Sequence, residues 1–243
     1  WSHHREWARY LRHRSGPPVA SPVGPAATPR PSFTSATLSN DALRDITRWR
    51  NANARGVSLT CVLTTAVHNA LTRGGVPMDD RGFYALIDMR TALPERSEPY
   101  WGNMSKSLYL TADPTDPHSV ESALRTARKT HRAVPASLVG AVASAVTRHR
   151  PPTALRPPAA PVTLTFNSIP TLPRLSDLPW HDQAGRRFYA FGPSLGPGGI
   201  SVSAIRLRGH MELTASFDEA TVTPETMRRS LESLSRVTDP HTG

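Results

Sequence analysis

One short stretch has the spacing of a catalytic nucleophile. Residues 192–196 read GPSLG, the G-x-S-x-G pattern in which a serine attacks an acyl carbon, and Asp218 and His241 follow it in a triad-like order. That chemistry needs a strand before the serine and a helix after it. Here residues 197–199 read PGG and lead into a strand-like run. The context favours a glycine-rich loop between strands, so a serine hydrolase using Ser194 is the least favoured of three functional hypotheses.

Residues that bind metals or form disulfides do not cluster. The chain has 10 histidines, and the only adjacent pair, His3-His4, would point about 100° apart on a helix. His68 lies on a helical pattern but off its apolar stripe, which favours a surface or packing role. Cys61 is the only cysteine, so an intramolecular disulfide is excluded, and its apolar surroundings predict a buried, inert thiol. We expect no metal site.

The charge of the chain favours an anionic partner. There are 29 Lys and Arg against 19 Asp and Glu, a formal charge of +10 over 243 residues. A nucleotide, an acidic protein or a membrane surface would each suit this charge. The basic residues are spread singly, so nucleic-acid binding is not expected. No apolar run approaches the roughly 20 residues of a membrane span, and we expect a cytoplasmic protein.

Proline-rich segments organise the chain. Residues 1–14 predict a short basic helix and residues 15–31 a linker, so residues 1–31 form a crossover and residues 32–243 one folded lobe. Within the lobe, helical and alternating patterns interleave, which predicts an α/β two-layer sandwich with a mixed β-sheet. The predicted strands are 32–38, 83–89, 105–110, 162–166, 187–190, 200–207 and 211–217, and the predicted helices are 40–54, 58–71, 116–133, 136–148 and 223–237.

Six segments, in order and spacing, resemble the C-terminal lobe of the condensation-domain and CoA-dependent acyltransferase superfamily, which has the chloramphenicol acetyltransferase-like fold. The wax-ester synthase, polyketide-associated acyltransferase and peptide-synthetase branches look equally near. The segments are the helix and proline-rich crossover from residue 5, the helix 58–71, the strand 85–90 (ALIDMR), the turn 101–103 (WGN), the strand 161–170 (PVTLTFNSIP) and the closing hairpin and helix 200–237.

The resemblance implies transfer of an acyl group from a CoA or carrier-protein thioester to an alcohol or amine. In this family the base is the second histidine of a His-His-x-x-x-Asp-Gly motif in the first lobe, and the motif is absent from this sequence. Residues 214–219 read TASFDE at the step where relatives carry a His-x-x-x-Asp-Gly motif, so Asp218 is kept while Thr214 and Glu219 replace the other two residues. We therefore expect no catalytic residue in this chain, and no turnover by the chain alone.

The missing half implies a partner. That partner would be an N-terminal lobe or a separate chain, and an acyl carrier protein is a further candidate. No tightly bound cofactor is implied, because the acyl-CoA or phosphopantetheine thioester is a co-substrate. The alternative function is a non-catalytic binding or scaffold module derived from the same fold.

Three residues match positions on the substrate side of the family. Arg90 either pairs with the first-lobe aspartate or is a surface charge at a strand end. Asn167 either lines the substrate tunnel or satisfies turn backbone, and for Asn103 the turn role is favoured. A lobe without its companion would also expose an apolar tunnel wall. The candidates for that wall are Trp101, Met104, Ile169 and Leu172.

Overall fold

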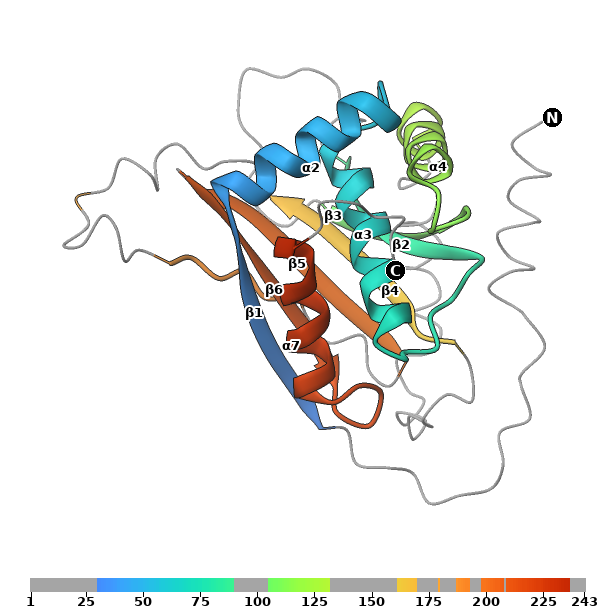
Figure 1. Cartoon of the computed structure of the whole chain (residues 1–243). Coiled ribbons are helices and arrows are strands. Elements are labelled where there is room, and N and C mark those ends of the chain that lie inside the picture. Colours follow the sequence, from blue (N-terminus) through green and yellow to red (C-terminus); the bar gives the residue numbers. More distant parts are fainter. Residues whose placement is uncertain are drawn as a thin grey trace, which may run out of the picture.

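The computed structural model describes residues 30–89, 105–131, 161–169, 179, 187–192, 198–207 and 209–236. They form a six-stranded sheet in the order β1-β6-β5-β4-β2-β3, with helices packed against it (Figure 1). The elements are β1 (Pro31–Ser39), α2 (Asn40–Asn53), α3 (Leu59–Arg73), β2 (Gly82–Asp88), β3 (Ser105–Thr111), α4 (Pro117–Lys129), β4 (Thr163–Ile169), β5 (Gly199–Leu207), β6 (His210–Asp218), α7 (Pro224–Ser233) and the 3-10 turn η2 (Leu234–Arg236).

The helices begin where the sequence places their caps. The hydroxyl of Ser39 accepts a hydrogen bond from the backbone N–H of Ala42, and Ser58 caps α3 in the same way. Asp116 caps α4, with Pro117 at the first helical position. This helix ends at Lys129 rather than at residue 133.

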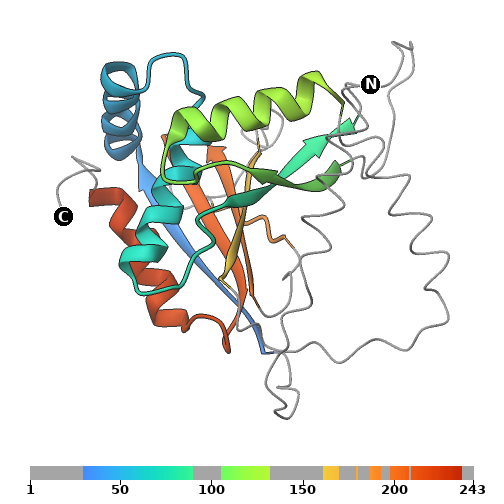
Figure 2. The same ribbon diagram turned by 90° about the vertical axis from the view of Figure 1, so that its right-hand side faces the viewer.

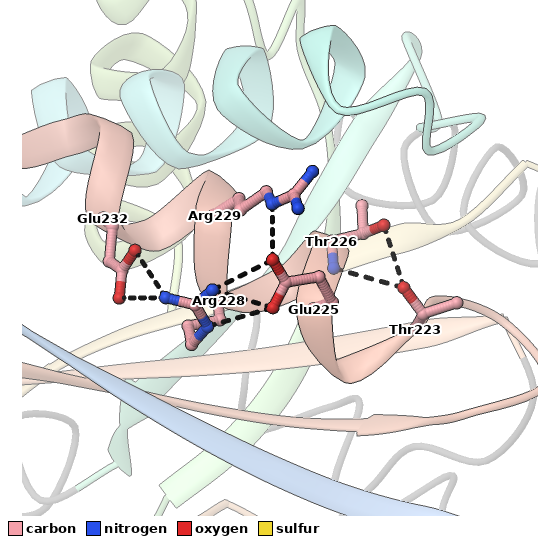
Figure 3. Close-up of polar contacts among 6 residues, drawn as sticks. All are labelled: Thr223, Glu225, Thr226, Arg228, Arg229 and Glu232. Atoms are coloured by element: carbon pink, nitrogen blue, oxygen red, sulfur yellow. Dashed lines mark hydrogen bonds and ion pairs between the residues drawn. The ribbon is translucent and has the colours of Figure 1, made fainter.

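The last helix, α7, has a cap and an exposed ion-pair network (Figure 3). The hydroxyl of Thr223 accepts a hydrogen bond from the backbone N–H of Thr226 at 3.1 Å. Arg228 lies between Glu225 and Glu232, at 2.8 Å from each. These side chains are exposed to solvent, so the ion pairs contribute little to the stability of the protein.

The sheet is mixed. β4 runs parallel to both β2 and β5, while β3, β6 and β1 are antiparallel to the strands they join. β5 and β6 form a tight hairpin in which Leu207 pairs with His210. Gly209, inside this turn, has φ +83°, a conformation that favours glycine. The carboxyl ends of β2, β4 and β5 therefore meet at one edge of the sheet.

The helices cover one face of the sheet and leave the other without a helix among the described residues. Figure 2 shows α2, α3 and α7 on one side, and an orange segment, residues 187–192, on the opposite side. Side chains alternate along the strands, so residues such as Leu164, Val202 and Leu213 enter the core beneath the helices. The residues between them in sequence point to the second face, which we call the outward face.

The structure confirms the predicted α/β fold with a mixed sheet. Among the described residues, no helix is long and apolar enough to cross a membrane. The predicted helices at 1–14 and 136–148 lie outside the described residues, and the boundary between a crossover and a lobe at residue 31 stays a prediction. The predicted strand at 187–190 is wrong: these residues belong to no strand of the sheet.

Candidate functional site

Asn167 lies near the carboxyl end of β4, between two parallel neighbours. It is in register with Ser203 of β5, and its side chain is half-buried. Asp88, the last residue of β2, pairs with Ser105, the first residue of β3, at the same edge of the sheet. In open sheets with parallel strands, ligands bind beyond the carboxyl ends of those strands. This edge is the candidate site.

The other two predicted site residues, Arg90 and Asn103, lie outside the described residues. Arg90 comes two positions after Asp88, and Asn103 comes two positions before Ser105. Both residues are thus close in sequence to described strand ends at the edge that carries Asn167. Their contacts with it, and with a substrate, stay a prediction.

A small cavity lies at this edge, between the first half of α3, α4 and the ends of β2 and β4. Its volume is about 60 Å³, room for one or two waters and too little for a substrate. Cys61 lines it, is fully buried, and has a pKa raised to about 12 by that burial. The prediction that this thiol is buried is confirmed, and its lack of reactivity stays a prediction. Thr60, Thr64, Arg128, Phe166, Asn167 and Ser168 are among the other lining residues.

The outward face next to Asn167 consists of hydroxyl side chains in register across three strands. Thr165 pairs with Ser201, which pairs with Ser216, and Asn167 pairs with Ser203, which pairs with Thr214. All five Ser and Thr side chains of these rows are buried. Within the described part of the chain, the hydroxyl oxygen of Thr165 has no hydrogen-bond partner, although a buried hydroxyl normally has one.

Residues 187–192, which we call the covering segment, lie across this face. The guanidinium of Arg187 reaches Glu212, and the ring of Phe191 packs edge-on against Phe33 of β1 at 4.8 Å. A side-chain carbon on Gly192 would come within 2.5 Å of the hydroxyl of Ser201. The alternating pattern was therefore misread, because the segment packs on the face of the sheet instead of hydrogen-bonding along an edge.

Glu212 is a buried acid of this face, with a side chain 1% exposed. It accepts hydrogen bonds from the hydroxyl of Thr37 at 2.9 Å and from Arg187 at 2.7 Å. The imidazole of His210 lies 3.3 Å from the same carboxylate without hydrogen-bond geometry. These contacts hold the covering segment on the sheet.

Three aromatic side chains form an exposed cluster that the sequence reasoning missed. Phe33 is 68% exposed, Tyr189 45% and Phe191 50%, and Phe191 contacts both of the others. Of the residues predicted to form an exposed apolar wall, Ile169 is half-buried. The other three, Trp101, Met104 and Leu172, lie outside the described residues. The signal for the cluster was the aromatic run 188–191, which was interpreted as part of a strand.

Asp218 has a structural role where β1 begins and β6 ends. It is 1% exposed, and its carboxylate accepts hydrogen bonds from the backbone N–H groups of Arg30 and Ala220. The carboxylate therefore fixes the start of β1 against the turn after β6. Ser194 and His241 lie outside the described residues. Among the described residues, no group of three His, Cys, Asp or Glu side chains could hold a metal ion.

The fold has clear counterparts among solved structures. PapA2 acyl transferase superposes with a TM-score of 0.57 at 14% identity, covering 98% of this chain and 51% of that chain. For the TRI3 trichothecene 15-O-acetyltransferase from Fusarium sporotrichioides the TM-score is 0.56 at 14% identity, over 86% of this chain and 46% of that chain. The X-domain from teicoplanin biosynthesis gives 0.56 at 16% identity, over 98% and 55%.

These matches show that the chain has the fold of these solved structures, and the sequence resemblance predicted an acyltransferase fold. No protein-family model matches the sequence, and no curated protein matches it significantly. The chain spans about half the length of the solved structures that it matches.

Proposed function

We propose that this chain is the second lobe of an acyltransferase or condensation-type enzyme. The enzyme would move an acyl group from a CoA or carrier-protein thioester to an alcohol or amine. One observation carries the proposal: 98% of this chain matches PapA2 acyl transferase, yet covers only 51% of it. The His-His-x-x-x-Asp-Gly motif is absent from the sequence, so the base would come from a companion half.

The companion half would also supply donors for the oxyanion that develops during acyl transfer. This lobe would contribute one wall of the substrate channel, at the edge where β2, β4 and β5 end. Arg90, Asn103 and Asn167 are the proposed substrate-side residues, and Arg90 would pair with an aspartate of the companion. The positive charge of the chain suits CoA phosphates or an acidic carrier protein, and we place the enzyme in the cytoplasm.

The exposed aromatic cluster is consistent with a missing companion. Monomeric proteins seldom leave neighbouring aromatic side chains uncovered, and such patches mark interaction surfaces. The absence of a catalytic base in the sequence also favours the second candidate, a binding or scaffold module that has lost its catalytic half. A coding region upstream of Trp1 that contains the His-His-x-x-x-Asp-Gly motif would favour the enzyme over the scaffold.

The test is reconstitution. The chain alone should release no thiol from acyl-CoA donors, and Ser194→Ala should change nothing. Joined to the companion half, it should transfer the acyl group, and Arg90→Ala should abolish that activity while leaving the stability of this lobe nearly unchanged. The matched control is Arg73→Ala, at the end of α3. Turnover by the chain alone that is lost in Ser194→Ala would contradict the proposal and favour a hydrolase.

A further inference from the structure

We propose that β1, at one side of the sheet, pairs with β1 of a second copy of this chain. The two strands would run antiparallel about a two-fold axis at Phe33, so that the sheets of the two copies become continuous. The inference goes beyond the proposed function and does not rest on it. It assigns an occupant to an edge strand and an aromatic cluster that no described element covers.

The first argument is the direction of the backbone groups of β1. No described strand lies beyond β1 at its side of the sheet (Figure 1). The carbonyl oxygen of Arg30 accepts a hydrogen bond from the backbone N–H of Glu219, which leads on from β6, at 2.9 Å. Because backbone groups alternate in direction along an antiparallel strand, Phe33 and Ser35 point their N–H and C=O groups away from β6. Pro31 falls in the same set, and a residue without an N–H is typical of an edge strand there.

The second argument is that this edge lacks the usual protection. Charged side chains, internal prolines and bulges keep edge strands from pairing with other chains. The nine residues of β1, PSFTSATLS, include no charged residue, and their only proline is the first. The register with β6 runs without a bulge from Pro31 to Ser39. The strand at the other side of the sheet, β3, contains Lys106. β1 is therefore the edge better suited to accept another strand.

The third argument is the aromatic cluster. Phe33, Tyr189 and Phe191 are the large apolar side chains that are exposed in the described part of the chain, and all three belong to this one cluster. Phe191 packs edge-on against Phe33, and Gly192, the next residue, lies over β5. Phe191 is thus on the inner side of Phe33, and the outer side of the Phe33 ring is open to a partner.

A second copy fits this edge because the strand is self-complementary about Phe33. Antiparallel pairing there places Phe33 opposite the same residue of the other copy, with two backbone hydrogen bonds between them. Each Ser35 lies opposite Pro31 of the other copy, with one bond from the serine N–H to the proline carbonyl. Aromatic rings directly opposite each other across an antiparallel pair attract one another. The pairing would therefore cover the most exposed ring of the cluster.

The local charges also favour an identical strand over a charged partner, although the chain carries a formal charge of +10. Arg30, beside the start of β1, pairs with Glu219 at 2.8 Å. Arg187 of the covering segment pairs with Glu212 at 2.7 Å. The described residues of β1 and of the covering segment thus present no unpaired cation to an acidic partner. Exposed charges farther away are screened beyond roughly 8 Å at physiological salt.

The test is the mass of the whole chain in solution, measured by sedimentation velocity from low to high micromolar concentration. The wild type should approach twice the mass of one chain. Phe33→Lys should raise the dissociation constant at least about tenfold, because like charges then face each other across the axis. Ser107→Lys places the same charge at an exposed position of β3 and is the matched control, which should dimerise like the wild type. Both positions are exposed, so neither substitution should lower the melting temperature.

Charge reversal tests the register. Phe33→Asp should also be monomeric alone, but a mixture with Phe33→Lys should form a heterodimer, because opposite charges then face each other. Hydrogen exchange gives an independent readout. The amide protons of Phe33 and Ser35 should become protected as the dimer forms, whereas that of Thr34, which points toward β6, should be protected in both states.

Three outcomes would overturn the proposal. A wild-type chain that stays monomeric at high micromolar concentration does so, and leaves the aromatic cluster to the companion half. Dimers that survive Phe33→Lys, or that Ser107→Lys removes, place the contact elsewhere. A mixture of Phe33→Lys and Phe33→Asp that fails to pair excludes an axis at Phe33.

Discussion

The guanidinium of Arg187 lies 2.7 Å from the buried carboxylate of Glu212, and this ion pair fastens the covering segment to β6. Arg187 also donates a hydrogen bond to Thr37 of β1, at 3.2 Å. The side chain of Arg187 therefore connects the covering segment with both β6 and β1. A carboxylate that is 1% exposed needs such partners, because water is excluded from it.

Replacing Arg187 by methionine should destabilise the protein by about 2 kcal/mol, because the charged hydrogen bond is lost while Glu212 stays buried. The free energy of unfolding in urea would measure the loss. Arg187 is half-exposed, so the cost should be below that of a fully buried pair. In the double variant Arg187→Met/Glu212→Gln, part of the stability should return, since the unpaired charge is removed.

Arg48→Met is the control for this prediction. Arg48 pairs with Asp45 on the exposed side of α2, and its loss should change stability by no more than about 0.5 kcal/mol. Equal effects of the two substitutions would show that the pair of Arg187 and Glu212 behaves as an ordinary surface contact.

At the start of α7, the cap should matter more than the ion pairs. Thr223→Ala removes the acceptor for the N–H of Thr226 and should cost about 1 kcal/mol. Arg228→Ala removes two exposed pairs and should cost less stability than Thr223→Ala, and that cost should shrink in high salt. Thermal unfolding at low and high ionic strength measures both. A cap effect that depends on salt, or an Arg228 effect that does not, contradicts this assignment.

Local signals in the sequence predicted most of the fold. The helix starts at residues 58 and 116, and the hairpin between the strands 200–207 and 211–217, each depend on residues close together in the sequence, and the structure has all of them. The prediction of a strand at residues 187–190 was wrong. The alternating pattern of these residues describes an extended chain, but whether such a chain joins an edge or packs on a face depends on distant partners such as Glu212.

Some interactions of the fold had no signal in the sequence. Asp79 is buried and accepts hydrogen bonds from the hydroxyl of Tyr109 at 2.8 Å and from the backbone and side chain of Arg81. Its carbonyl oxygen lies 3.1 Å from the imidazole of His68, which is buried and packed as the helical pattern suggested. Strand pairing brings Tyr109 to this aspartate across 30 residues, and no local pattern encodes that contact.

In the candidate site, too, one feature was predicted from the sequence and another was visible only in the structure. Asn167 was predicted from a family resemblance, and the structure places it at the edge where the parallel strands end. The missing hydrogen bond of Thr165 became visible only when the register of three strands was known. An unsatisfied hydroxyl is a property of the packed fold, so the sequence of β4 alone could not predict it.

Glu121 should stabilise the protein only above acidic pH. Burial alone would raise the pKa of Glu121. Hydrogen bonds, first of all from the backbone N–H of Ser58, lower the pKa by more than burial raises it, to about 2. A pKa below the ordinary 4.5 means that the contribution is complete above pH 4.5 and is lost as the pH falls toward 2. At pH 7, Glu121→Gln should cost about 1–2 kcal/mol.

The gap between the wild type and Glu121→Gln should narrow steadily in denaturation curves recorded between pH 5 and pH 3, since only the wild type titrates at this position. Because both proteins contain the same other carboxylates, their contributions to the pH dependence of stability cancel in the comparison. A gap that stays constant over this range would mean that the pKa of Glu121 is the same in the folded and unfolded states, and that its bond to Ser58 contributes nothing.

The contribution of Cys61 to stability should have the opposite pH dependence, because it should be lost as the pH rises. Burial raises its pKa from 9.0 to about 12, so the folded protein holds the thiol proton after the unfolded chain has released it. Stability from this group is therefore complete below pH 9 and should fall by up to about 1.4 kcal/mol per pH unit above it. Cys61→Ala should be less stable at pH 7, because a cavity replaces the sulfur, and should lose less stability on going to pH 10.

Reaction with a disulfide reagent gives a second measure of the same thiol, because only the thiolate attacks and the reagent must reach it. At pH 8, native Cys61 should react far more slowly than the same residue in guanidinium chloride, and the native rate should follow the fraction of molecules that open. Leu124 of α4 lines the same cavity. The substitution Leu124→Ala should therefore raise the rate of Cys61 modification in proportion to the stability that the protein loses. Rapid modification of the stable native protein would show that the cavity beside Cys61 is open to solvent, and would make this cysteine a reactive group rather than part of the core.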